Sequence, residues 1–460
     1  MLNRKFAIIY AGFVELSLVA NYPGRTNADT LVMLWQAHNV SALDAWNAPF
    51  CSFFYGLLGP VFGYPFGGLI LQSLVMLAWP AQVMSSLISS SSVRPSARVI
   101  CIVLWTLVSC CFIALAGELI KDMIFCSFLS LAFFVCGSVE SDESLLQIGG
   151  GRAVALVAAI VAMAVIRPSN IVLVAITGVA LIVWGRGAGL ATSRILSAAA
   201  LTLCLSLVAT AGQNALFSAS PGSSYLPTVV HDIAGISANQ HQDYFAELSG
   251  GQPDPANIAR CYSPKEAAPL IWGDCKKIAE SLLPLGASVL GKWLGLVVSH
   301  PGAYLMHRAR FAAHVLIADN TGTKNIVAVP PLYLTAMNNA GGLAWLRRPE
   351  LADHLQLWNP TIAYAPFGNI AGLLVGEGWL KQPLIWCCIC MIGLAWSIYR
   401  KPTGKMMSLY LLAVIGLANV MTIVWIAPSD DLRYLGPTWM CALGSIAITC
   451  KDILQRGSAP

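Results

Sequence analysis

The sequence predicts an all-α membrane protein of about ten transmembrane helices, with a large extracytoplasmic region that contains interfacial helices. First, 57% of the 460 residues are hydrophobic and only 11% are charged, whereas a soluble domain usually carries about 25% charged residues. Second, uncharged apolar runs recur, and residues 99–117 form one that nearly crosses a hydrocarbon core of about 30 Å. Third, lysine and arginine gather in alternate loops, as the positive-inside rule requires.

The apolar runs place the spans along the chain. The first run follows Asn3, Arg4 and Lys5 and has no small-residue cleavage site after it, which indicates a retained helix and not a signal peptide. The expected spans lie near residues 6–20, 65–88, 99–117, 123–138, 153–166, 171–184, 195–212, 384–399, 406–427 and 434–450.

Two further apolar segments, residues 285–300 and 304–317, contain charged side chains such as Lys292 and Arg308. This pattern is typical of amphipathic helices that lie at the membrane surface. An even number of extra spans in this region would also satisfy the charge rule, so a count of twelve stays open.

The loop charges predict that both termini are cytoplasmic. We therefore expect an N-terminal transmembrane module of about seven helices in residues 1–212, whose first outer loop is 21–64. A large extracytoplasmic region with amphipathic helices follows in 213–383, and a C-terminal module of about three helices occupies 384–460. The basic residues of the inside loops are Arg4, Lys5, Arg94, Arg98, Arg152, Arg186, Arg194, Arg400, Lys401, Lys405, Lys451 and Arg456.

Basic residues on the outer side are the exceptions to this pattern. One such residue at a helix end is commonly a charge that reaches the membrane interface. Four of them on one surface favour a site for an anion. The order Asp431-Leu432-Arg433-Tyr434 places a guanidinium beside a hydroxyl donor, which suits a phosphate group. The four outer cations are Arg25, Lys121, Arg167 and Arg433.

Carboxylates accompany these cations. Asp29 precedes an apolar stretch, so it is either a helix cap or a general base at the membrane surface, and both interpretations stay open. Glu118, Lys121 and Asp122 lie within five residues of one another, which a solvated connector between two spans also explains.

Taken in order, these short motifs resemble those of C-type membrane glycosyltransferases. The resemblance spans most of the chain and depends on the order of the motifs and their shared side of the membrane. One departure is Asn47-Ala48-Pro49, where members of the family often have a histidine before the proline. The matching motifs are Tyr22-Pro23-Gly24 with Asp29 and Gln36, Glu118 with Lys121-Asp122, Arg167-Pro168-x-Asn170, His231-Asp232 to Ser237, His300-Pro301-x-x-Tyr304-x-x-His307-Arg308, and Asp431-x-Arg433-Tyr434.

The resemblance implies a multi-pass enzyme of the bacterial inner membrane that modifies a surface polysaccharide such as O-antigen. The implied donor is a polyprenyl phosphate sugar, the acceptor is a glycan, and transfer inverts the anomeric centre. Asp29 is the implied base, Asp122 or Asp44 is the candidate second carboxylate, and the cations would stabilise the leaving phosphate. The expected substrate-binding residues are Arg25, Lys121, Arg167, Arg433, Tyr434, His231 and Asp232.

Most of the 14 cysteines lie in apolar runs, where a thiol behaves as a small hydrophobe. Cys261 and Cys275 instead lie in the longest polar segment, which predicts a disulfide bond in an oxidising compartment. Metal binding is the weaker interpretation of nearby histidines and aspartates, so no cofactor is assigned and a divalent metal stays open. The residues concerned are His231, Asp232, His241 and Asp243.

Two other functions remain as alternatives. A polysaccharide polymerase or ligase also acts at the outer face on polyprenyl-linked sugars. A secondary transporter would be expected to have two related halves and ionisable groups near mid-membrane, whereas only Glu15 falls clearly within an expected span. Membrane lipid is the expected surrounding, and no basic run indicates a nucleic-acid partner.

Overall fold

The structure is a computed structural model that describes most of the chain. The described residues are 4–317 without 23, 26–27, 39–47, 64, 90–94, 138–149, 168–169, 188–191, 217–224, 253, 272 and 287, then residue 367, and 382–456 without 401–403 and 429–431. Within these residues the chain is helical, and the β-structure is limited to isolated bridge residues, which include the pair Arg25 and Glu118. The all-α class predicted from the sequence is confirmed.

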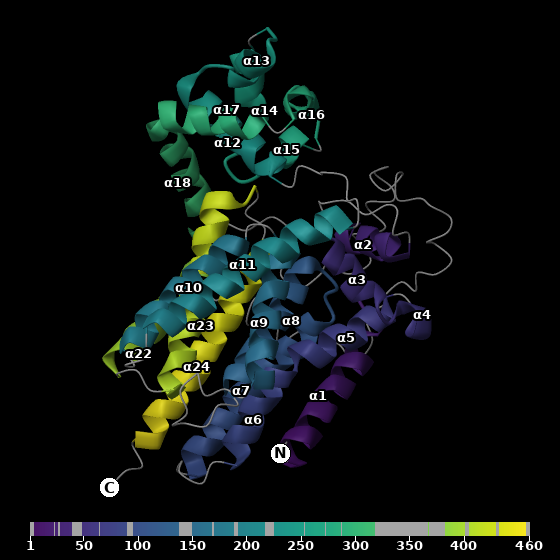
Figure 1. The fold of residues 1–460 in the computed structure, drawn as a ribbon, viewed down its shortest axis with the longest axis vertical. Coiled ribbons are helices and arrows are strands. Elements are labelled where there is room, and N and C mark those ends of the chain that lie inside the picture. The colour runs from purple at the N-terminus through teal and green to yellow at the C-terminus, as the bar shows by residue number, and fades with distance from the viewer. Residues whose placement is uncertain are drawn as a thin grey trace.

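The longer helices run alongside one another as a bundle (Figure 1). They occupy all ten ranges in which the sequence predicts spans, and the second range holds two helices that break at Leu77. The bundle helices are α1 (Arg4–Asn21), α5 (Phe66–Met76), α6 (Ala78–Ser89), α7 (Pro95–Ala116), α8 (Lys121–Gly137), α9 (Gly150–Ile166), α10 (Asn170–Gly187), α11 (Thr192–Leu216), α22 (Pro383–Tyr399), α23 (Gly404–Ile426) and α24 (Gly436–Arg456).

Four segments of the described chain are long and apolar enough to cross a membrane. A fifth is counted only if the bent pair formed by residues 276–285 and 288–299 is one span. Some of the other bundle helices are shorter than a full crossing, which needs about 20 residues; α8 and α9 have 17 residues each. The fold is therefore that of a polytopic membrane protein, while the predicted number of spans stays a prediction. The four segments are Phe66–Ser89, Pro95–Ala116, Leu196–Gln213 and Leu409–Ile426.

A continuous core packs the bundle together. Trp79 belongs to this core, with ring contacts to Trp105, Phe112 and Phe133 at centroid distances of 5.1–5.9 Å. Outward-facing positions of α11 are also apolar, and Val208 is 68% exposed. Apolar side chains inside and outside are expected of helices whose surroundings are lipid and not water.

A second group of helices, which we call the head, gathers at one end of the bundle (Figure 1). It has a separate core of residues such as Val230, Ile233, Tyr244 and Leu270. The helix α18 runs from the head to the bundle, where it packs against α22 and α23. The head comprises α12 (Leu226–Gln240), α13 (Tyr244–Ser249), α14 (Pro255–Cys261), α15 (Ala268–Ile271), α16 (Lys276–Glu280), the 3₁₀ helix η3 (Leu283–Leu285), α17 (Ser288–Ser299) and α18 (Pro301–Ile317).

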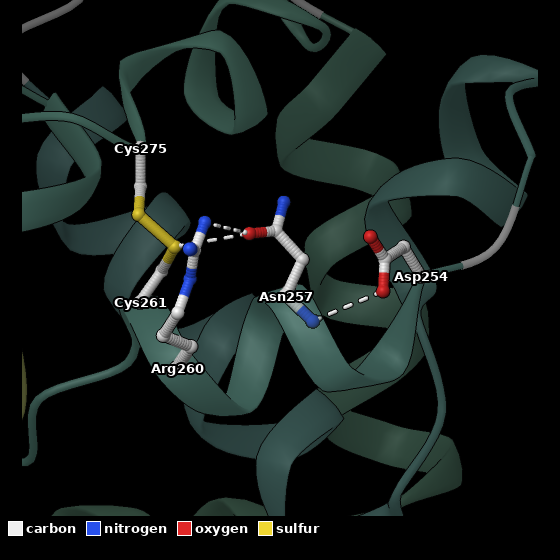
Figure 2. The surroundings of a disulfide bond; sticks show 5 residues. All are labelled: Asp254, Asn257, Arg260, Cys261 and Cys275. Carbon is white, nitrogen blue, oxygen red and sulfur yellow. Dashed lines mark hydrogen bonds between the residues drawn. A yellow bond between two sulfur atoms is a disulfide. The ribbon is translucent and has the colours of Figure 1, made fainter.

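A disulfide bond joins Cys261, at the end of α14, to Cys275, just before α16, with a Cα–Cα distance of 6.0 Å. Figure 2 shows its surroundings, in which the Asp254 carboxylate accepts a hydrogen bond from the Asn257 amide at 3.0 Å and so caps α14. Arg260 donates to the Asn257 side chain at 2.9 Å. The disulfide bond thus connects the capped helix α14 to the segment just before α16.

Short helices complete the end of the bundle that faces the head. They are α2 (Ala28–His38), α3 (Pro49–Gly56), α4 (Gly59–Phe62) and the 3₁₀ helix η6 (Leu432–Leu435). The head is held on the end of α23 by hydrogen bonds from Thr228 to the Ile426 carbonyl at 2.6 Å and from the Ala267 amide to the Pro428 carbonyl at 2.8 Å. The start of α1 and the end of α24 lie at the opposite end of the bundle (Figure 1).

Candidate functional site

The turn between α7 and α8, residues 117–120, is fixed by side chains from three other helices. A helix leaves its last four carbonyl groups without partners inside the helix. Asn21, Gln72 and Tyr55 donate hydrogen bonds of 2.8–2.9 Å to carbonyl groups within residues 113–120. Buried hydrogen bonds from side chains of three helices to one turn rigidify it, so they hold the start of α8 in place.

The first turn of α2 is attached to the same place. The hydroxyl of Thr30 donates to the carbonyl of Leu119, two residues before Lys121. The preceding residue, Asp29, is partly buried. The structure therefore brings the segment that carries Asp29 next to the segment that carries Lys121 and Asp122.

A cavity of about 370 Å³ lies between this end of the bundle and the head. Its size is in the usual range for small-molecule sites, about 300–1,000 Å³. Lys121 and Arg167 line it from the bundle, and Thr228 and Trp293 line it from α12 and α17 of the head. Other polar or aromatic lining residues are Asn170, Tyr225, Asn419, Thr422, Trp425 and Tyr434.

Arg167 is held by two neighbours. Its guanidinium forms an ion pair with Asp122, whose side chain is 4% exposed. Its Cζ atom lies 4.4 Å from the ring centroid of Tyr434, a favourable position for a cation over an aromatic face. Asn419 in turn donates to the Tyr434 carbonyl at 3.0 Å. Three of the predicted motifs, containing Asp122, Arg167 and Tyr434, thus meet at one cavity.

Arg25 has a different environment. Its side chain is 1% exposed, and Nε lies 2.9 Å from Oε1 of Glu118, with which it also forms the isolated backbone bridge. The guanidinium donates as well to the carbonyl of Ala114. This enclosed ion pair favours a role in holding the turn, in place of the substrate contact expected from the sequence. The side chain of Arg433 lies outside the described residues, although its backbone belongs to η6.

Asp232 lies in a buried cluster behind the head side of the cavity. Its Oδ1 is 2.7 Å from Nη2 of Arg308 and 3.2 Å from Nε2 of His307. Its Oδ2 accepts a hydrogen bond from Trp293 Nε1 at 3.1 Å. The motif that begins at His231 and the motif that ends at Arg308 therefore meet in one cluster. Trp293 connects this cluster to the cavity, which it lines.

The crossing of α12 and α18 depends on Gly235. A Cβ atom at this position would overlap the ring atoms of His307. The missing side chain lets the two helices approach closely enough for Asp232 to reach His307 and Arg308. Arg308 then extends to the bundle and donates to the Ala427 carbonyl at 3.0 Å, so the cluster also helps to hold the head in place.

Burial keeps the two histidines of the cluster neutral. His231 Nε2 donates to the Ser263 carbonyl at 2.8 Å, and burial lowers the pKa of this imidazole to about 3. Burial also lowers the pKa of His307, whose Nδ1 accepts from the Tyr262 hydroxyl at 2.8 Å. Burial raises the pKa of Tyr262 to about 12. The ion pair of the cluster is that of Asp232 with Arg308.

Across the described part of the chain, no group of three or more histidine, cysteine, aspartate or glutamate side chains is placed to hold a metal ion. Two of the four residues considered as ligands have structural positions at helix ends. His241 ends α12 in the left-handed conformation, at φ 53°. Asp243 caps α13 by accepting from the Ala246 amide at 3.1 Å.

Several residues of the cavity were not singled out from the sequence. Asn419 interrupts an apolar run, and a polar side chain within an expected span is a signal that could have identified it. Trp293, Trp425, Tyr225 and Thr228 have no such signal, because aromatic residues and threonine are common in amphipathic helices and at membrane interfaces.

Comparisons with known proteins give little further guidance. No protein-family profile matches the chain, and no curated protein matches it. Among solved structures, the structure of this chain is similar to the crystal structure of ArnT from Cupriavidus metallidurans bound to undecaprenyl phosphate. The two sequences are 14% identical, the match covers 97% of this chain and 77% of that chain, and the TM-score is 0.36. Similarity at this level assigns no activity, so the function has to be inferred from the residues of this chain.

Proposed function

We propose that this protein is an inverting membrane glycosyltransferase that moves a sugar from a polyprenyl phosphate carrier to a surface polysaccharide or lipid-linked glycan. The observation that carries the proposal is the cavity at the head end of the bundle, which Lys121 and Arg167 line together. Cationic side chains beside a hydroxyl or amide donor suit a phosphate group. The order of the outer motifs supports the same class of enzyme.

A lipid-linked donor fits the surroundings of the cavity. The helices α8, α9, α10 and α23 contribute to its lining and also enclose an apolar space of about 50 Å³ deeper in the bundle. Phe125 lines the apolar space about one turn after Lys121, and Leu173 lines it about one turn after Asn170. An apolar space about one helical turn from a cationic cavity matches a hydrocarbon chain that ends in a phosphate.

The proposed reaction has one bond-forming and one bond-breaking event at the anomeric carbon. The acceptor hydroxyl attacks that carbon, its proton passes to the carboxylate of Asp29, and the bond to the phosphate oxygen breaks. The leaving polyprenyl phosphate gains negative charge, which Lys121 and Arg167 stabilise. The products are polyprenyl phosphate and the glycosylated acceptor.

Asp122 has a supporting role in this proposal. Its carboxylate is nearly buried and paired with Arg167, which favours holding the guanidinium over acting as a second carboxylate at the sugar. We therefore treat it as a positioning residue. Asp29, on a separate helix fixed to the turn before Lys121, remains the proposed base.

The test compares Asp29→Asn and Arg167→Gln with the wild-type protein in cells that make the native glycan, with expression matched by immunoblot. Arg400→Gln is the control, because Arg400 also pairs with an aspartate, Asp452, at 3.2 Å. We expect mass spectrometry of the surface glycan to show loss of the modification in Asp29→Asn and in Arg167→Gln, and full modification in the control. Full modification in Asp29→Asn would show that the proposed base is wrong.

A second measurement separates a transferase from a transporter or a polymerase. Membranes that contain the protein are given a polyprenyl phosphate sugar and the acceptor glycan. A transferase releases polyprenyl phosphate and adds one sugar to the acceptor. Movement of the lipid across the bilayer without release, or growth of the acceptor by many repeat units, would contradict the proposal.

A further inference from the structure

Trp293 joins the buried Asp232 cluster to the wall of the cavity. The indole lines the cavity from α17, while its Nε1 donates to Asp232 Oδ2 at 3.1 Å. Leu290 lines the same cavity three residues earlier, so one face of α17 is turned toward it. Because the indole has a single N–H donor and Asp232 accepts from it, the ring offers mainly carbon surface to a ligand.

The cluster fixes the direction of this indole. Asp232 is fully buried, and its other oxygen is held by Arg308 at 2.7 Å and lies 3.2 Å from His307. Arg308 is in turn bonded to the Ala427 carbonyl at the end of α23. A side chain whose rotamer is locked by a bonded second layer is better suited to recognition than a free surface residue.

The position of Trp293 corresponds to one part of a lipid-linked sugar. The apolar space lies within the bundle, Lys121 and Arg167 lie at the helix ends, and Trp293 and Thr228 belong to the head. The donor has its hydrocarbon chain, phosphate and sugar joined in the same order. With the phosphate at the cations, the sugar reaches the head side of the cavity.

We propose that Trp293 determines specificity for the donor sugar by stacking against the apolar C–H face of a pyranose ring, and that Asp232 is the positioning residue that orients it. This inference rests on the proposed function. The negative face of an indole attracts the weakly positive hydrogens of such a ring, as it does the edge of another aromatic ring. Asp232, expected from the sequence to bind substrate, thus acts through Trp293.

The test measures binding to the purified full-length protein in lipid nanodiscs. The probes are bare polyprenyl phosphate and polyprenyl phosphate bearing glucose, galactose or mannose; the sugar that binds the wild type most tightly is used for all variants. We expect Trp293→Ala to weaken binding of the sugar-bearing lipid about tenfold, which corresponds to about 1.4 kcal/mol. Binding of the bare lipid should change less than about twofold, and Trp293→Phe should restore part of the loss.

Asp232→Asn should reduce the preference for the sugar-bearing lipid in the same way, and combining it with Trp293→Ala should add little, because both act on one contact. The matched control is Trp396→Phe, since Trp396 also donates to an aspartate, Asp452, at 3.3 Å but does not line the cavity. Melting temperatures of all variants check that each one is folded.

The outcomes separate this inference from the proposed function. Arg167→Ala should weaken both lipids, because it removes a phosphate ligand; if it weakens neither, the proposed phosphate site is wrong. If Arg167→Ala behaves as expected but Trp293→Ala weakens both lipids equally, or neither, the role of Trp293 is wrong while the proposed function stands. An absence of any sugar preference in the wild type would also overturn the inference.

Discussion

Asp122 and Arg167 form an ion pair that joins the start of α8 to the residue after α9. Tyr434, from the last turn before α24, covers the same guanidinium at 4.4 Å. Residues far apart in the sequence are thus assembled into one cationic wall. The pair leaves Arg167 partly exposed, with 21% of its side chain accessible, so the guanidinium keeps access to the cavity that it lines.

Removal of the Asp122 charge should therefore affect turnover more than lipid binding. In Asp122→Asn the guanidinium loses its fixed orientation, and misplacement of a catalytic contact by about 1 Å can reduce rate up to about 100-fold. We expect kcat to fall at least about tenfold while affinity for polyprenyl phosphate holds or rises, because one negative charge is gone. Asp452→Asn, which breaks the Arg400 pair, should leave both unchanged. An unchanged kcat in Asp122→Asn would rule out the positioning role.

Acid should destabilise the fold through His231. The pKa of this imidazole is about 3 in the folded protein against an ordinary value of 6.5, so below pH 6.5 the unfolded chain binds a proton that the folded chain does not. The free energy of unfolding therefore has its full value above pH 6.5. Below pH 6.5 it falls by roughly 1.4 kcal/mol for each pH unit, because the unfolded chain binds one more proton than the folded chain. Melting temperatures in detergent from pH 7.5 to 5 check this. His231→Gln should flatten the slope, and an equal slope in His231→Gln and the wild type would contradict this role.

Gly235 should not tolerate a side chain. Alanine at this position forces its Cβ into the ring of His307, and overpacking of this kind costs about 1–3 kcal/mol. Thermal unfolding should show a lower melting temperature for Gly235→Ala. At Gly295 of α17 a Cβ would meet nothing within 4 Å, so Gly295→Ala should match or exceed the wild type, since alanine favours a helix by up to about 1 kcal/mol. Equal stability of the two variants would contradict the close crossing of α12 and α18.

The disulfide should stabilise the head. Cys261 and Cys275 are 14 residues apart, and closing a loop of this length contributes about 3 kcal/mol in the chain-entropy treatment. Cys261→Ser/Cys275→Ser should melt at a lower temperature than the wild type. Reductant should lower the melting temperature of the wild type and should leave that of the double serine variant unchanged. Equal gel mobility of the wild type with and without reductant would show that the bond does not form.

The sequence was sufficient for the helices and for part of the site. Charge-free apolar runs identify helices because lipid-facing and buried positions are both apolar, and the outer motifs containing Lys121, Arg167 and Tyr434 do line one cavity. Trp293 could not be identified in this way. Its role depends on a contact with Asp232, 61 residues away, and no local pattern records that pairing.

The role of a single charged residue was harder to predict from the sequence than the positions of the helices. Arg25, Lys121 and Arg167 are alike in the sequence, at helix ends on one side. The difference lies in long-range packing: Arg25 is enclosed with Glu118, whereas Lys121 and Arg167 line the cavity. Burial of a particular side chain follows from how the helices meet, which hydrophobic periodicity does not specify.

The central claim is that Lys121 and Arg167 bind the phosphate of a lipid carrier, and it is tested most directly by the affinity of the purified protein for polyprenyl phosphate in nanodiscs. Lys121→Ala leaves the Asp122–Arg167 ion pair intact and should weaken binding about tenfold; Lys121→Ala/Arg167→Gln should weaken it about 100-fold or more, since each charged hydrogen bond contributes about 1.5–3 kcal/mol. Arg400→Gln should bind as the wild type does. Wild-type affinity in the double variant, at an unchanged melting temperature, would contradict the account.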